Sequence, residues 1–178
     1  MAETQTRKGE VTMKGKPVDV AGPRLSVGAT APPFTCVGAG LSIVTMADTK
    51  GKARLFNVVP SLDTPVCNRQ TRYFSEQLKA LGDSVAAYTV SLDLPVAQAR
   101  WCTEASVDNL KNLSDLHDKS FGEHYGVLIT SLPIPLLARA VFVVGADDTI
   151  KYVEYVPEVA QEPDYEPALT ALKAAAGA

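Results

Sequence analysis

The sequence is poor in cysteine and histidine. Its 178 residues include three cysteines and two histidines. The cysteines, Cys36, Cys67 and Cys102, are odd in number and widely spaced, whereas a disulfide-stapled secreted scaffold carries an even and denser set. No Cys-x-x-Cys pair occurs, so a zinc site would have to be assembled from scattered residues. We therefore expect no metal, and interpret the cysteines as reactive or structural thiols.

Long apolar runs and an excess of positive charge are also absent. No apolar stretch approaches the length that spans a bilayer, and the formal net charge is -3. A negative net charge does not favour binding to a nucleic acid, so we expect no nucleic-acid partner. Because no long apolar stretch is present, we also expect no membrane association. The first eight residues lack the apolar core of a secretory signal, which favours a cytoplasmic protein.

The composition that is present is that of an ordinary globular protein. Hydrophobic residues make up 46% of the chain and charged residues 21%, which does not suggest disorder. A chain of 178 residues can bury a substantial core without needing a second one. We expect a single domain over residues 1–178.

The patterns of apolar residues, proline and glycine predict the order of elements. A β-hairpin is expected at 10–21, where alternating residues flank a turn at 14–17. A strand, a helix and a strand between 53 and 91 form a βαβ crossover, whose strands are parallel. The expected strands are 34–37, 42–45, 53–59, 84–91, 110–113, 139–144 and 149–155, and the expected helices are 65–81, 95–102, 120–125 and 164–175.

The stretch 127–137 is apolar but contains Pro133 and Pro135. Proline breaks a helix and cannot donate to the ladder of a central strand, so neither is expected here. Because large exposed apolar patches usually mark contacts, this stretch is a candidate for an interface or for the rim of a substrate site.

Cys67 lies at the predicted start of the helix 65–81. Thr64 suits the N-cap position, where its hydroxyl can accept from an unpaired N–H group, and Pro65 suits the first helical position. Cys67 then falls in the first turn, where the free N–H groups and the positive end of the helix dipole favour a thiolate. The alternative is a buried, inert cysteine.

Pro60-x-x-x-Thr64-x-x-Cys67 resembles the active-site signature of peroxiredoxins, and the wider string 60–67 resembles that of their thiol peroxidase subfamily. Residues 93–102 and 162–169 are also similar to that subfamily, so the resemblance runs from the hairpin to the last helix. It implies an α/β, thioredoxin-like fold: a central mixed sheet flanked by helices, with an added N-terminal β-hairpin. The predicted order of elements agrees with that fold.

The resemblance also implies a role for each residue of the site. Cys67 would be the peroxidatic cysteine, which attacks a hydroperoxide and becomes a sulfenic acid, and Cys102 the resolving cysteine, which converts it to an intramolecular disulfide. Thr64 and Arg139 would hydrogen-bond the thiolate and the peroxide, and Pro60 would stiffen the loop. From the residues alone, Thr64 could aim its hydroxyl at the thiolate, cap the helix or do both, and Pro60 could stiffen the loop or have no function. Arg139, a charge at the start of an apolar strand, could reach into the site or be solvated.

Bridged cysteines need Cα atoms within about 7 Å, so if Cys67 and Cys102 lie on separate helices, we expect one or both to unwind locally. The family resemblance further implies thioredoxin as reductant, a homodimer, a preference for alkyl or lipid hydroperoxides, and no cofactor. Cys36 is expected to be a core residue.

Two rival functions are a cysteine hydrolase that pairs Cys67 with His117 or His124, and a non-enzymatic redox sensor.

Overall fold

The structure is a computed structural model that describes residues 5–177. Its strands are β1 (Thr6–Met13), β2 (Lys16–Ala21), β3 (Thr35–Val37), β4 (Ile43–Thr45), β5 (Ala53–Val58), β6 (Val85–Ser91), β7 (Lys111–Ser114), β8 (Leu128–Ile129), β9 (Leu136–Leu137), β10 (Ala140–Val144) and β11 (Ile150–Tyr155). Its α-helices are α1 (Pro65–Leu78), α2 (Pro95–Ala105), α3 (Ser120–His124) and α4 (Tyr165–Ala176), with short 3-10 turns at Ala39–Leu41, Met46–Thr49 and Gly82–Ser84.

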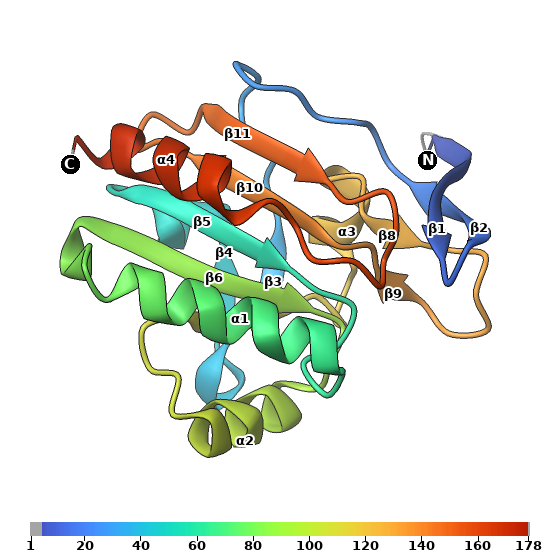
Figure 1. Cartoon of the computed structure of the whole chain (residues 1–178), viewed down its shortest axis with the longest axis horizontal. Coiled ribbons are helices and arrows are strands. Elements are labelled where there is room, and N and C mark those ends of the chain that lie inside the picture. Colours follow the sequence, from blue (N-terminus) through green and yellow to red (C-terminus); the bar gives the residue numbers. More distant parts are fainter. Residues whose placement is uncertain (1–4, 178) are drawn as a thin grey trace.

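A seven-stranded mixed sheet organises the molecule, in the order β11-β10-β5-β6-β7-β3-β4. The central pair β5 and β6 is parallel, as the βαβ pattern predicted, and β10 pairs antiparallel with β5. Every residue of β5 is buried. Figure 1 shows α1 and α4 over the near face of this sheet and the hairpin β1–β2 at one end of the molecule. The predicted mixed sheet, flanking helices and N-terminal hairpin are all present.

The central strands separate two apolar clusters, because successive side chains of a strand point to opposite faces. Leu55 of β5 and Val141 of β10 pack with Phe74 of α1 and Leu172 of α4. On the other face, Phe56 belongs to a cluster that also contains Phe121 and Tyr125 from α3 and its C-terminal end, and Val18 and Val20 from the hairpin. The hairpin is therefore packed into a core.

Several boundaries differ by a few residues from the prediction, and one segment differs in its structure. Helix α1 ends at Leu78 rather than at residue 81, because a turn and the Gly82–Ser84 3-10 helix follow. Strand β10 begins at Ala140, one residue after Arg139. The stretch 127–137 contains β8 and β9, which pair with each other and extend the hairpin into a second sheet, β1-β2-β8-β9. Both prolines lie in the loop between these strands, where no ladder bond needs their missing N–H.

None of the helices formed by residues 5–177 has the length and apolar character needed to cross a bilayer.

Asp115 anchors the short helix α3 to the end of β7. Its buried carboxylate accepts from the backbone N–H groups of Phe121, at 2.9 Å, and Gly122, at 2.7 Å. The thiol of Cys36 also donates to it, at 3.7 Å. Burial raises the pKa of Asp115 to about 6, against the opposing effect of the two backbone donors. The folded protein therefore holds a proton on Asp115 at pH values where the unfolded chain has released it.

This gives the first prediction, that Asp115 makes folding less favourable as the pH rises from about 4 to about 6. Below that window the group is neutral in both states, and within it only the unfolded chain ionises, so the free energy of unfolding falls by up to ~1.4 kcal/mol per pH unit. Asp115→Asn has no such ionisation. Urea unfolding of both proteins should therefore show a wild-type advantage that shrinks across this window; an advantage independent of pH would contradict the prediction.

Candidate active site

Cys67 is buried in the first turn of α1, at the carboxyl end of β5. Strand β5 ends at Val58, and a loop through the buried Pro60 leads to Pro65, the first residue of α1. The sulfur of Cys67 is 0% exposed together with the rest of its side chain. The carboxyl ends of parallel strands are where sites gather in such sheets, so the fold places Cys67 where the sequence predicted it.

Thr64 directs its hydroxyl at the sulfur instead of capping the helix. It occupies the N-cap position of α1, but its side chain makes no capping hydrogen bond, so the prediction of a side-chain cap is wrong. The hydroxyl lies 2.8 Å from Cys67 Sγ and 3.0 Å from the Ser61 carbonyl oxygen. A hydroxyl has one proton. It can donate to Ser61 while accepting from a thiol, or donate to a thiolate, so the pair adapts to either state of Cys67.

Arg139 supplies the second donor to the sulfur. It is 2% exposed, and its Nη2 lies 3.3 Å from Cys67 Sγ. Its Nε donates to the carbonyl oxygen of Val159, at 2.9 Å, and its Nη1 donates to Gln70 Oε1. The alternative of a solvated arginine is therefore wrong. Within residues 5–177 no carboxylate forms an ion pair with Arg139. Of the three hydrogen-bond partners of this guanidinium, the sulfur of Cys67 is thus the one that can carry a negative charge.

A buried polar network continues from Arg139 into the core. Gln70 accepts from Arg139 and donates to Asn57 Oδ1 of β5. The amide nitrogen of Asn57 donates in turn to the hydroxyls of Thr71, at 3.0 Å, and Thr89, at 3.1 Å. All of these side chains are buried. Because buried polar groups are costly when unpaired, the network fixes the orientation of Arg139.

The loop before Cys67 is fastened by Asp93. Its carboxylate accepts from the Ser61 hydroxyl at 2.8 Å and from the backbone N–H of Leu62 at 2.9 Å. Asp93 directly precedes the turn into α2, the helix that carries Cys102. The segments leading to the two cysteines are therefore joined at one carboxylate.

Cys102 lies on α2 and is half-buried. It is a free thiol, as are Cys67 and Cys36. Asn112 donates to its sulfur at 3.0 Å, and burial raises the pKa of the Cys102 thiol in spite of that donor. The side chain also lines a cavity of about 600 Å³ between α2, β7 and the Ala39–Leu41 turn. The structure therefore places Cys67 and Cys102 on separate helices, each held by its own partners.

The remaining candidates do not join this site. Cys36 is buried and its sulfur donates to Asp115; burial above all raises the pKa of its thiol, as expected of a core cysteine. His117 and His124 are exposed, and neither is a hydrogen-bond partner of Cys67, whose partners are Thr64 and Arg139. Residues 5–177 also contain no group of three or more His, Cys, Asp or Glu side chains placed to hold a metal.

Comparison with known proteins agrees with this geometry. Residues 26–169 match the Redoxin family. A thiol peroxidase of Halalkalibacterium halodurans is 53% identical over 165 residues, which cover 93% of this chain and 98% of that protein. The chain belongs to the thiol peroxidase family. A thiol peroxidase of Bacillus subtilis is 47% identical over 165 residues, 93% of this chain and 97% of that protein.

Membership of the thiol peroxidase family confirms the enzyme class expected from the sequence, a peroxiredoxin-type oxidoreductase. Among solved structures, a peroxiredoxin-like protein from Aquifex aeolicus is 36% identical and superposes with a TM-score of 0.86, covering 94% of this chain and 98% of that one. This similarity confirms the thioredoxin-like fold.

The sequence analysis of this thiol peroxidase family member missed the buried polar residues that support Arg139. Asn57 and Arg54 are the two polar residues of β5, whose other residues are apolar. Gln70 follows Cys67 by three residues and so lies on the same side of α1. Both patterns were visible signals of a buried polar pair. The role of Asp93 carried no comparable signal, because it depends on which loop lies beside it.

The second prediction is that Gln70→Leu destabilises the fold. The substitution removes a buried acceptor from Arg139 and a buried donor from Asn57, leaving two unpaired groups that cost about 1–3 kcal/mol each. We expect urea unfolding to show a loss of roughly 2–4 kcal/mol in the free energy of unfolding. Gln161→Leu changes an exposed glutamine and should stay within about 0.5 kcal/mol of the wild type. If the two variants had equal free energies of unfolding, the hydrogen bonds of Gln70 would not contribute to stability, and the prediction would be wrong.

Proposed function

We propose that this protein reduces hydroperoxides through a sulfenic acid on Cys67, which Cys102 resolves as an intramolecular disulfide that thioredoxin then reduces. The observation that supports it most is the sulfur of Cys67 between the Thr64 hydroxyl, at 2.8 Å, and the Arg139 guanidinium, at 3.3 Å. Both groups can donate to a thiolate, which is the reactive form of cysteine, and one of them is a cation.

In the first step the Cys67 thiolate attacks the terminal oxygen of the hydroperoxide. An S–O bond forms and the O–O bond breaks; sulfur is oxidised to a sulfenic acid, and the leaving alkoxide or hydroxide takes up a proton from solvent. Negative charge moves from sulfur to oxygen during this step. The guanidinium of Arg139 and the hydroxyl of Thr64 lie beside the sulfur that this charge leaves, so we propose that they also donate to the peroxide oxygens and thereby stabilise the transition state.

In the second step the Cys102 sulfur attacks the sulfenic sulfur, forming the disulfide and releasing water. Disulfide geometry requires the two residues to approach, so we propose that α2, α1 or both unwind locally. Helix α2 and the segment after it are held to α1 by polar contacts: Arg72 donates to the Ala105 carbonyl of α2 at 3.0 Å, and Ser75 donates to Asn109, which follows α2. In its folded position Cys102 has a raised pKa, so unwinding would also expose a more readily ionised thiol.

Further properties of the proposal rest on the family resemblance. These are a preference for alkyl or lipid hydroperoxides, a homodimer, a cytoplasmic location, and a reaction cycle that needs no metal or organic cofactor. The apolar stretch 127–137, in which Ile134 is 64% exposed, is the candidate surface for the dimer or the substrate rim.

Steady-state turnover tests the proposal. Hydrogen peroxide and cumene hydroperoxide should each be consumed with thioredoxin, thioredoxin reductase and NADPH, and Cys67→Ser should abolish this turnover. A non-enzymatic sensor would form the disulfide without sustaining turnover. A hydrolase that pairs Cys67 with a histidine would lose activity when His117 and His124 are both replaced, whereas peroxide turnover should survive that change.

The third prediction separates the two cysteines. Cys102→Ser should react once with peroxide and then stop, because its sulfenic acid has no resolving partner; excess peroxide should oxidise it further to sulfinic acid, a gain of two oxygens in the mass spectrum. Cys36→Ser is the matched control and should retain turnover, because its thiol lies in the core. Full thioredoxin-linked turnover in Cys102→Ser would disprove the resolving role.

The fourth prediction concerns the hydroxyl of Thr64. Thr64→Val keeps the shape of the side chain but removes the donor to sulfur, so the rate constant for oxidation of Cys67 by peroxide should fall about 10²-fold. Thr64→Ser retains the hydroxyl and should recover most of that rate. Stopped-flow measurement of Cys67 oxidation checks both variants. If valine and serine react equally fast, the hydroxyl has no part in the chemistry.

A further inference from the structure

We infer that the N-terminal hairpin β1–β2 positions the guanidinium of Arg139 through Glu158, which makes Glu158 a positioning residue for the reaction at Cys67. Glu158 does not touch the sulfur; it acts through the loop 156–160, which connects β11 to the segment before α4. The inference rests on the proposed role of Arg139 at Cys67.

The loop 156–160 sets the direction of the guanidinium. Arg139 Nε donates to the carbonyl oxygen of Val159 at 2.9 Å, and the backbone carbonyl of Arg139 accepts from Val156 at 3.0 Å. The guanidinium is a rigid planar fork, so the bond at Nε and the bond from Nη1 to Gln70 together determine where Nη2 points. Nη2 is the atom that donates to Cys67. A shift of Val159 would therefore move the donor at the sulfur.

The hairpin holds this loop by backbone pairing. Thr12 of β1 donates its N–H to the Pro157 carbonyl at 2.8 Å, and its carbonyl accepts from the N–H of Val159 at 2.8 Å. Thr12 and Glu158 thus form an isolated parallel bridge. The residue whose carbonyl binds Arg139 is therefore bonded, through its own N–H, to the hairpin.

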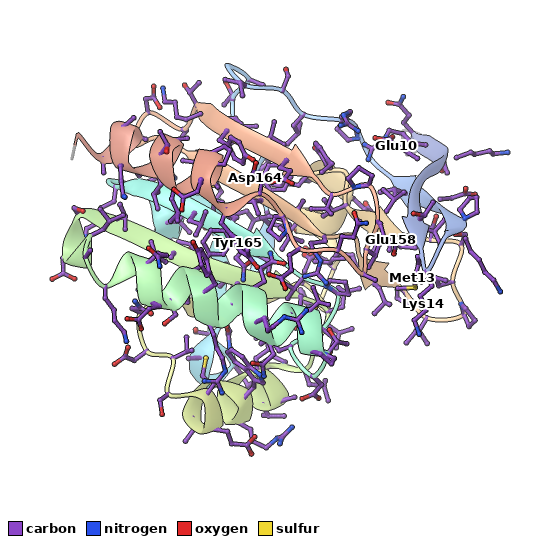
Figure 2. The ribbon with its side chains drawn as sticks, viewed as in Figure 1. Glu10, Met13, Lys14, Glu158, Asp164 and Tyr165 are labelled. Atoms are coloured by element: carbon purple, nitrogen blue, oxygen red, sulfur yellow. The ribbon has the colours of Figure 1, made fainter. Side chains whose placement is uncertain are left out.

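The carboxylate of Glu158 completes the attachment with four donors. It accepts from the backbone N–H of Lys14, Gly15 and Ala160, each at 2.9 Å, and from the Thr12 hydroxyl at 2.8 Å. Figure 2 shows Glu158 beside Met13 and Lys14 at the tip of the hairpin, whereas Glu10 lies apart from it. These donors lower the pKa of Glu158 to about 2, so the carboxylate is ionised at neutral pH. Within residues 5–177 it forms no ion pair, so its partners are hairpin and loop dipoles rather than a side-chain cation.

Glu158→Gln is the test. An amide has one acceptor oxygen, and its NH₂ group would face N–H donors of the hairpin turn, so the turn would no longer be held. We expect the rate constant for oxidation of Cys67 by cumene hydroperoxide, measured by stopped flow, to fall at least about tenfold, since displacing an aligned group by 1 Å can cost about 10²-fold. Glu10→Gln, on the same hairpin, disrupts ion pairs with Arg7 and Arg24 and should leave this rate unchanged.

A double-variant cycle distinguishes positioning from general stabilisation. Arg139→Ala alone should lose about 10²- to 10³-fold in the same rate. If Glu158 acts through Arg139, the double variant should be no slower than Arg139→Ala, because coupled residues are not additive. A merely structural glutamate would instead slow both backgrounds by the same factor.

Four outcomes count against the inference or its basis. A wild-type rate in Glu158→Gln, or equal losses in both backgrounds, overturns the positioning role alone. A wild-type rate in Arg139→Ala overturns the proposed role of Arg139 itself. If Glu158→Gln does not fold, Thr12→Val removes one donor to the carboxylate and should lower the rate in the same direction, with recovery in Thr12→Ser; no change in Thr12→Val would then count against the inference.

Discussion

The burial of Arg139 beside Cys67 is the constraint on which the rest of the site depends, because no carboxylate among residues 5–177 forms an ion pair with this arginine. Removing a guanidinium from water costs several kcal/mol unless its donors are satisfied. Here they are satisfied by a sulfur, an amide oxygen of Gln70 and a backbone carbonyl of Val159. The sulfur and the amide oxygen belong to the first two turns of α1, and the carbonyl belongs to the loop 156–160. The arginine therefore joins parts of the chain that are distant in sequence, and the sulfur is the member of this set that can supply a compensating charge.

The two cysteines are held to different degrees. Cys67 lies against a buried network that extends through Asn57 to Thr71 and Thr89, in the middle of the sheet. Helix α2, in contrast, buries Gln98, Trp101 and Ala105, and leaves Cys102 half-exposed over a cavity of about 600 Å³. Segments with few buried contacts open at low free energy. The geometry therefore favours α2 as the element that unwinds in the proposed second step, while Cys67 stays in place.

The sequence predicted what local signals encode. Cys67 was found because proline and threonine mark the start of its helix, and the order of strands and helices followed from apolar periodicity. Arg139 stood out as a charge at the start of an apolar strand, but a strand-opening arginine is also compatible with exposure, and the family resemblance was needed to favour a role at the site. Glu158 and Gln70 were not found, because their roles depend on which distant segments meet. The side-chain cap expected of Thr64 failed for a related reason: the sulfur three residues later competes for the same hydroxyl.

Oxidation of Cys67 changes the balance that holds the site together. In the proposed cycle the thiolate is a negative charge beside Arg139, whereas the sulfur of a Cys67–Cys102 disulfide carries no charge. The guanidinium then loses the charge that its Nη2 faces, and taking the partner away from a buried charge is destabilising. The disulfide state therefore holds the start of α1 less tightly than the reduced state does. Re-reduction restores the thiolate and with it the interaction that favours the folded arrangement.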